Sequence, residues 1–234
     1  MKGKSSKVSS SSMVGASSKK VVQIPGDGNC FFNAVLVAHV NAHNGQYPII
    51  EGQEIRIQEQ LRFMVGTYYL QDFQNVKIFL KAALIDVIKI GNFAGLHGLG
   101  LADIRNTYQK TYPEDQNCID YQGNEITDEL IQQYINGIKD GTIWGGGQEL
   151  GILSRLLKIK IKLSGQRDPY DDSGDVDARE VEIQYVGGNH YNVVVSSIEN
   201  PAVKELMSSI GAEIKDTSHI ILKNRLAYWK VLIL

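Results

Sequence analysis

Cysteine is scarce in this sequence, because only Cys30 and Cys118 occur among 234 residues. Two thiols are too few for a disulfide scaffold or a four-thiolate zinc site, so a cysteine with a function must act nearly alone. Long apolar runs are also missing, since no stretch approaches the ~20 residues that a membrane-spanning helix needs. The basic N-terminus leads into serines rather than into the apolar core of a signal peptide. We therefore expect neither a membrane span nor Sec-dependent secretion.

A basic excess is missing as well. The chain has 24 Lys+Arg against 26 Asp+Glu and a formal net charge of -2, which is not the charge of a protein that binds a phosphate backbone. We therefore expect no nucleic-acid partner. Residues 1–20 contain eight serines, five lysines and no acidic residue. They have too few apolar side chains to offset the entropy of ordering the backbone, so we predict a disordered Ser/Lys-rich arm over 1–20.

Helical spacing of apolar residues dominates the first part of the folded chain. One helix is predicted to begin at Cys30, because apolar side chains follow it at intervals of three and four. Further helices are predicted over 53–73, 75–90 and 101–110, and from Thr127, which could cap a helix. Residues 44–140 are thus expected to be largely helical, and their length suggests an insertion.

Strand patterns come late in the sequence. Residues 158–163 and 181–186 alternate apolar and polar side chains, and the segment 190–195 follows the second of them across a Gly-Gly-Asn turn as a hairpin partner. We therefore expect an α+β domain over 21–200, with a small central β-sheet, built from the C-terminal half, between flanking helices. Residues 201–234 are expected to form an extension that packs on this domain, with a helix beginning near Pro201.

Cys30 is the residue with the most chemical promise. It follows Gly26, Asp27, Gly28 and Asn29, a turn sequence, and it opens a helix whose first N–H groups have no intrahelical partner. Unpaired amides and the helix dipole favour a thiolate, so we predict a pKa below the free value of ~8.5. The alternative is a structural cysteine that fills a strand-to-helix corner.

A nucleophilic thiol needs a base, and His190 is the best candidate. It opens the alternating strand after the Gly-Gly-Asn turn, so a sheet would hold its ring at the mouth of a loop. Asn192 lies two residues later and shares its face of the strand, where an amide oxygen could orient the imidazole. In the alternative interpretation, His190 is a turn residue and Asn192 satisfies a strand edge.

These segments resemble the ovarian-tumour (OTU) family of deubiquitinating cysteine proteases. GDGNCFFNAV is similar to that family's cysteine loop, in which an Asp-Gly-X-Cys element opens the central helix, and GGNHYNVVV is similar to its histidine strand. Between them, TIWGGGQELGILSRLLKIKIKL resembles a third family segment, with Trp-Gly-Gly, Glu-Leu in a helix and then a strand. The three elements occur in the family's order and cover about 50 residues, so the resemblance implies a papain-like OTU fold.

The resemblance also implies roles for individual residues. Cys30 would be the nucleophile, His190 the general base and acid, and either Asn192 or Asp27 the third member of the triad, with Asp27 also shaping the cysteine loop. The residues expected at the substrate are Gly28, Asn29, Gly188, Asn189 and Tyr191. The implied reaction is hydrolysis of the isopeptide bond at the C-terminal glycine of ubiquitin, with no metal and no cofactor.

Other interpretations stay open. The resemblance implies ubiquitin or polyubiquitin as partner and a monomer in the cytosol, or in a host cytosol if this is a microbial effector. A related hydrolase or acyltransferase acting on another ubiquitin-like tail and a non-catalytic ubiquitin-binding module are the alternatives. His39 and His43 have the spacing of a zinc-binding pair but lack the accompanying glutamate and a third ligand, so we expect no metal. Trp144 is expected to be a core aromatic, whereas Gly145 to Gly147 could line a narrow channel or open a helix.

Overall fold

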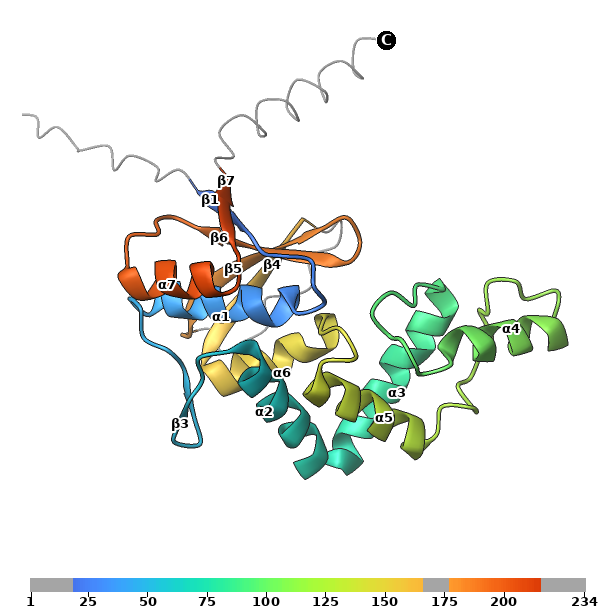
Figure 1. Ribbon diagram of the computed structural model, residues 1–234. Coiled ribbons are helices and arrows are strands. Elements are labelled where there is room, and N and C mark those ends of the chain that lie inside the picture. The colour runs from blue at the N-terminus through green and yellow to red at the C-terminus, as the bar shows by residue number, and fades with distance from the viewer. Residues whose placement is uncertain (1–18, 166–176, 216–234) are drawn as a thin grey trace, which may run out of the picture.

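The computed structural model describes residues 19–165 and 177–215, and Figure 1 shows how their helices lie around one main sheet. The five strands of this sheet are ordered β4-β5-β6-β1-β7, and a separate pair joins β2 to β3. The strands are β1 Lys20–Gln23, β2 Ile49–Ile50, β3 Gln53–Glu54, β4 Ile159–Ser164, β5 Arg179–Val186, β6 His190–Val195 and β7 Glu213–Lys215. The predicted α+β class, with a small central sheet flanked by helices, is confirmed.

The sheet is mixed in direction. β4 and β5 run parallel, with Ile161 opposite Val181, whereas the other neighbouring strands are antiparallel. The hairpin of β5 and β6 is present as predicted, with Val186 opposite His190 at its closed end. The expectation that the sheet comes from the C-terminal half is wrong in one respect. β1 lies between β6 and β7, and its residues Val21 and Val22 are β-branched, as strands favour.

Seven helices are present in the part of the chain that the structure describes. They are α1 Cys30–Ala42, α2 Gln58–Gln71, α3 Phe73–Ile90, α4 Leu101–Thr111, α5 Asp128–Asp140, α6 Gly147–Leu157 and α7 Pro201–Ser209. α1 packs against β5, β6 and α7 beneath the sheet, and 11 of its 13 residues are buried. A helix that is apolar on all sides must lie in the core, so the sequence itself buries the segment that begins with Cys30.

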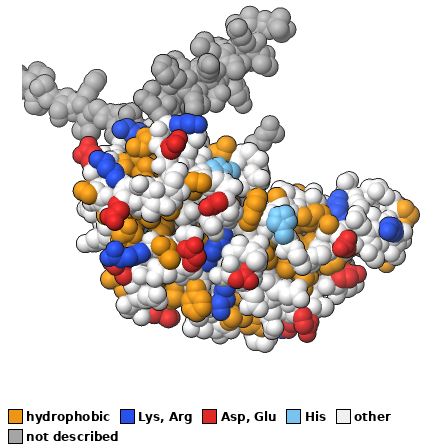
Figure 2. All heavy atoms as spheres, viewed as in Figure 1, with side chains coloured by type: hydrophobic (Ala, Val, Ile, Leu, Met, Phe, Trp, Pro, Cys, Tyr) orange, Lys and Arg blue, Asp and Glu red, His pale blue; other side chains and the backbone are white. Residues whose placement is uncertain are grey.

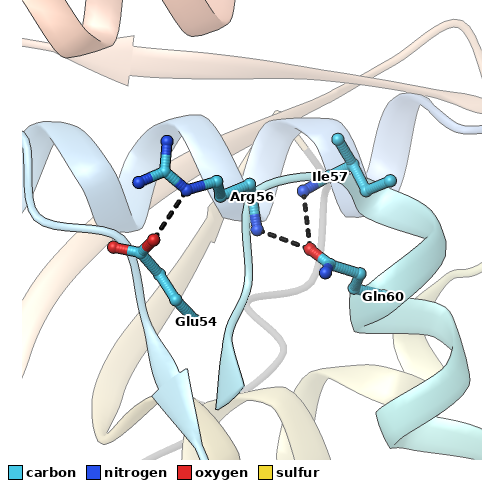
Figure 3. Close-up of polar contacts among 4 residues, drawn as sticks. All are labelled: Glu54, Arg56, Ile57 and Gln60. Carbon is cyan, nitrogen blue, oxygen red and sulfur yellow. Dashed lines mark hydrogen bonds and ion pairs between the residues drawn. The ribbon is translucent and has the colours of Figure 1, made fainter.

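The helices α2 to α5 form a group that extends away from the sheet, with α4 at its far end (Figure 1). α3 ends at Gly91, whose φ of 77° lies in the left-handed region, and Thr127 Oγ1 accepts a hydrogen bond from the Leu130 N–H at the start of α5, as predicted. At the start of α2, Gln60 Oε1 accepts hydrogen bonds from the N–H groups of Arg56 and Ile57, at 2.7 and 3.3 Å (Figure 3). This cap fixes where α2 begins.

Some predicted boundaries differ from the structure. The predicted helix over 53–73 begins only at Gln58, because residues 53 and 54 pair with β2. Lys20, which we assigned to the N-terminal arm, is the first residue of β1. The arm over 1–18, most of the acidic stretch after β4 and the tail beyond 215 lie outside the described residues. The domain limits of 21–200 and 201–234 therefore stay a prediction, although α7 does pack on α1.

None of the helices in residues 19–165 and 177–215 combines the length and the hydrophobicity that crossing a membrane requires. Figure 2 shows acidic and basic side chains scattered among apolar ones on the face viewed, so neither sign of charge dominates that face.

Candidate active site

The loop before α1 is held in one conformation by its own side chains and by Trp144. Gly28 has a φ of 86°, which few residues other than glycine adopt, and a Cβ on it would lie 2.7 Å from Trp144 Nε1. Asp27 Oδ1 accepts a hydrogen bond from the Asn29 N–H at 2.9 Å. Asp27 thus shapes the cysteine loop, as expected, and Gly28 is required by both its backbone angle and its neighbour.

His190 and Asn192 form a hydrogen-bonded pair at the start of β6. Asn192 is buried, and its Oδ1 lies 3.1 Å from His190 Nε2 and accepts a second hydrogen bond, from the Ile24 N–H, at 3.1 Å. An amide oxygen only accepts, so His190 Nε2 must donate. The neutral imidazole therefore keeps its lone pair on Nδ1. Of the two candidates for the third member of a triad, the one bonded to the imidazole is Asn192, whereas Asp27 bonds to Asn29.

The cysteine loop and the histidine strand meet at this point. A Cβ on Gly26 would lie 3.7 Å from His190 Nδ1, so the free nitrogen of the imidazole faces the loop. The backbone N–H of Tyr191, the next residue along β6, forms a hydrogen bond with the Cys30 thiol. The structure therefore brings together segments that are about 160 positions apart in the sequence.

Burial raises the pKa of the Cys30 thiol, which is 5% exposed, and the Asp27 carboxylate adds to this effect. The N–H groups of Tyr191, Phe31 and Cys30 itself lower the pKa, but by less. The prediction that the helix N-terminus would lower the pKa is therefore wrong in sign. The amides lower the pKa as expected, but removing the thiolate from water costs more free energy than their hydrogen bonds provide. Deprotonation of Cys30 in this environment calls for a base at close range.

A groove lies between α3 and the residues on either side of His190, Asn189 and Tyr191, which line it. Its volume is about 220 Å³, and its apolar wall consists of Leu80, Ala83, Leu84 and Val87 of α3. The lining also includes Trp144, Gly145, Gly146, Gly147, Gly188, Asn189 and Tyr191. The structure thus places Gly188, Asn189 and Tyr191 on the groove, as expected for substrate contacts. Gly28 and Asn29 instead contact Trp144 and the buried side chain of Arg62.

The three glycines after Trp144 differ in what surrounds them. A Cβ on Gly145 would lie 2.3 Å from Phe32 Cε2, so packing of the core requires glycine there. A Cβ on Gly146 would make only ordinary contacts, and one on Gly147 would meet nothing within 4 Å. Gly146 and Gly147 therefore leave the groove open without being needed for folding. Trp144 is half-buried and lines the groove, so the expectation of a core aromatic is wrong.

Two buried charged residues support the site, and their burial was not predicted from the sequence. Arg62 is 1% exposed, and Glu149 is fully buried at the start of α6. Arg62 stands three, four and seven residues before Val65, Gly66 and Tyr69, and this spacing signals the buried face of α2. A charged residue on such a face was the available sign of a special role.

Within the described residues, no three histidine, cysteine or acidic side chains gather as metal ligands would. His39 and His43 are stacked, with ring centroids 4.1 Å apart, and burial lowers the pKa of His39 to about 4, with a further contribution from His43. The pair is therefore a packing contact between α1 and its C-cap residue in this structure.

The chain matches the model of a known protein family. The family model for OTU-like cysteine proteases matches residues 25–198, which include Cys30, His190 and the Trp-Gly-Gly segment. Among solved structures, the chain is similar to an OTU deubiquitinase from Wolbachia pipientis wMel, at 16% identity and a TM-score of 0.40, over 81% of this chain and 97% of that one. No curated protein matches the chain.

Proposed function

Since the chain belongs to the OTU-like cysteine proteases, we propose that it is a deubiquitinase that cleaves the isopeptide bond at the C-terminal glycine of ubiquitin. Cys30 is the nucleophile, His190 the general base and acid, and Asn192 the residue that orients the imidazole. The observation that carries the proposal is the contact between the Cys30 thiol and the Tyr191 N–H, beside a His190 ring whose other side is bonded to Asn192.

The raised pKa of Cys30 sets the order of the proton transfers. His190 Nδ1 removes the proton as the sulfur attacks the carbonyl carbon, and the negative charge moves to the carbonyl oxygen, near the first-turn N–H groups of α1. The imidazolium then gives its proton to the lysine nitrogen as the C–N bond breaks. Water attacks the thioester with His190 as base, and the ubiquitin carboxylate and free thiol are released.

The groove supports a substrate tail that ends in glycines. Gly146, Gly147 and Gly188 line the groove without side chains of their own, so an extended glycine tail fits against their backbone, while α3 offers apolar contacts. Another ubiquitin-like protein with such a tail fits the same groove. It is therefore the second candidate substrate. The site of action is the cytosol, or a host cytosol for a microbial effector.

The function is tested with linkage-defined diubiquitins, incubated with wild type and Cys30→Ala. Wild type is expected to release monoubiquitin from at least one linkage, and Cys30→Ala, folded to the same melting temperature, from none. In parallel, ubiquitin-like proteins that carry a C-terminal electrophile are offered to the wild type. If one of these proteins reacts and ubiquitin does not, that protein is the substrate. If none of them reacts, the chain is a non-catalytic binding module.

A further inference from the structure

Arg62 lies under the cysteine loop and is almost completely buried. Its Nη2 donates to the Gly28 carbonyl oxygen at 2.8 Å, and its Nε donates to Asn29 Oδ1 at 3.0 Å. On the other side, Nη1 donates to the carbonyl oxygens of Ile138 and Ile143, at 3.2 and 2.9 Å. One side chain of α2 thus ties the loop that carries the nucleophile to the end of α5 and to the segment before Trp144.

Every one of these acceptors is uncharged. Within residues 19–165 and 177–215, no carboxylate oxygen comes within ion-pair distance of the guanidinium, which instead stacks on the Phe32 ring with Cζ 4.5 Å from its centroid. Burial lowers the pKa of Arg62, while the more distant carboxylates of Glu149, Glu59 and Asp27 oppose this effect. A guanidinium keeps its proton in any protein environment, so a nearly unpaired positive charge remains beneath the loop.

Arg62 and Asp27 hold the same peptide group from opposite sides. The carbonyl oxygen of Gly28 is bonded to Arg62, and the N–H of the same peptide unit, which belongs to Asn29, is bonded to Asp27. A planar trans peptide cannot rotate when both of its polar ends are fixed. The next carbonyl, that of Asn29, accepts the first hydrogen bond of α1 from the Asn33 N–H at 2.9 Å. The direction of the Cys30 N–H therefore depends on the hydrogen bonds that Arg62 and Asp27 make to the Gly28–Asn29 peptide.

We propose that Arg62 is a positioning residue for the reaction, which fixes the Gly28–Asn29 peptide and supplies the positive charge that stabilises the Cys30 thiolate and the oxyanion. The inference rests on the proposed function of Cys30. Charge and geometry make separable contributions, because lysine would keep the charge and lose the fork of donors, whereas methionine would keep most of the apolar volume and lose both.

The test compares Arg62→Met, Arg62→Lys and the control Arg105→Met. Arg105 of α4 also donates to backbone carbonyls, those of Ile88, Lys89 and Gln116, but far from the loop. The readouts are the melting temperature, the rate of Cys30 alkylation by iodoacetamide against pH, and kcat and KM on ubiquitin with a fluorogenic C-terminal amide.

Arg62→Met is expected to raise the apparent pKa of alkylation and to lower kcat about 10- to 100-fold, with KM changed less than about threefold. Arg62→Lys should keep the wild-type alkylation profile but lose about tenfold in kcat. Arg105→Met should lower only the melting temperature. A folded Arg62→Met with the wild-type profile and kcat would overturn the inference.

If Arg62→Met does not fold, Arg62→Lys decides, because a wild-type kcat in that variant would contradict a role for the fork. Failure of the proposed function looks different, since the wild type would then cleave no ubiquitin substrate although Cys30 is alkylated, or would cleave it no faster than Cys30→Ala does. In that case Arg62 would have no reaction to support.

Discussion

Two buried charges lie on either side of the active site and differ in what neutralises them. Arg62 donates to carbonyl and amide oxygens, so its charge stays available to the cysteine loop. Glu149 accepts from Tyr134 and Tyr69, at 2.7 and 3.1 Å through Oε1, and from the Gly146 N–H at 2.7 Å through Oε2. Burial raises its pKa, and these donors oppose the rise. Arg62 thus holds the cysteine loop by hydrogen bonds, whereas Glu149 holds the glycine wall of the groove.

Both of these buried charged side chains nevertheless have several hydrogen-bond partners. His39 has no such support, because its buried Nδ1 has no partner in the described part of the chain. It is therefore kept neutral, with a pKa of about 4 in the folded state against 6.5 in the reference state.

The largest predicted effect concerns this unsupported histidine. The unfolded chain binds a proton at His39 below pH 6.5 and the folded chain only near pH 4, so the free energy of unfolding should fall through this window by about 3 kcal/mol. Urea unfolding of wild type and His39→Leu at pH 7.5 and pH 4 checks the prediction. Between pH 7.5 and pH 4, the free energy of unfolding should fall further in the wild type than in His39→Leu. Parallel pH dependences would mean that His39 is already paired or solvated.

Next in size is Asn192→Ala. Neither buried charge contacts the imidazole, so orientation of His190 depends on the amide oxygen, and kcat should fall by about 100-fold with little change in KM. Steady-state kinetics on the fluorogenic ubiquitin substrate measure both constants. Asn192→Asp, which keeps the acceptor, serves as the control and should retain most of the activity. Equal losses in both variants would contradict this role, because Asn192→Asp keeps an oxygen that can accept from both His190 and Ile24.

Glu149→Gln tests the other half of the comparison. The NH₂ group of glutamine would replace either the oxygen that accepts from the Gly146 N–H or the oxygen that accepts from the two tyrosines. One donor would then be left unpaired, so the free energy of unfolding should fall by about 1–3 kcal/mol. KM should rise while the pH profile of Cys30 alkylation stays as in wild type. A shifted alkylation profile would show that Glu149, like Arg62, bears on the nucleophile, and the two regions would no longer be distinct.

The smallest effect is expected at Gly147. Alanine there meets nothing within 4 Å and begins α6, so the melting temperature should hold, but its methyl group enters the groove and should raise KM by roughly 3- to 10-fold. Gly145→Ala is the matched contrast, since its methyl group would collide with Phe32 and lower the melting temperature. A Gly147→Ala enzyme with unchanged KM would indicate that the substrate tail does not pass this wall.

The structural features that could be predicted from the sequence are those that depend on a local pattern of residues. The helix that begins at Cys30, the hairpin that ends at His190 and the α5 cap at Thr127 each follow from a few neighbouring residues, and the structure has them as predicted. The central place of β1 could not be predicted, because strand order depends on contacts between distant segments.

The electrostatics of the site were harder to predict than its geometry. The helix start before Phe31 suggested a lowered pKa for Cys30, but the burial that reverses the shift arises from β6 packing on α1. The partners of Arg62 come from three separate segments, so its spacing with Tyr69 could indicate burial but not the loop that it holds.

The most direct test is covalent capture by ubiquitin with a C-terminal propargylamide, followed by intact-mass analysis and peptide mapping. The chain carries its own control, because Cys118 is fully buried in another loop. We predict one ubiquitin adduct per chain, mapped to Cys30, and none in Cys30→Ala. An adduct on Cys118, or none on folded wild type under conditions in which ubiquitin-like probes also fail, would contradict the account.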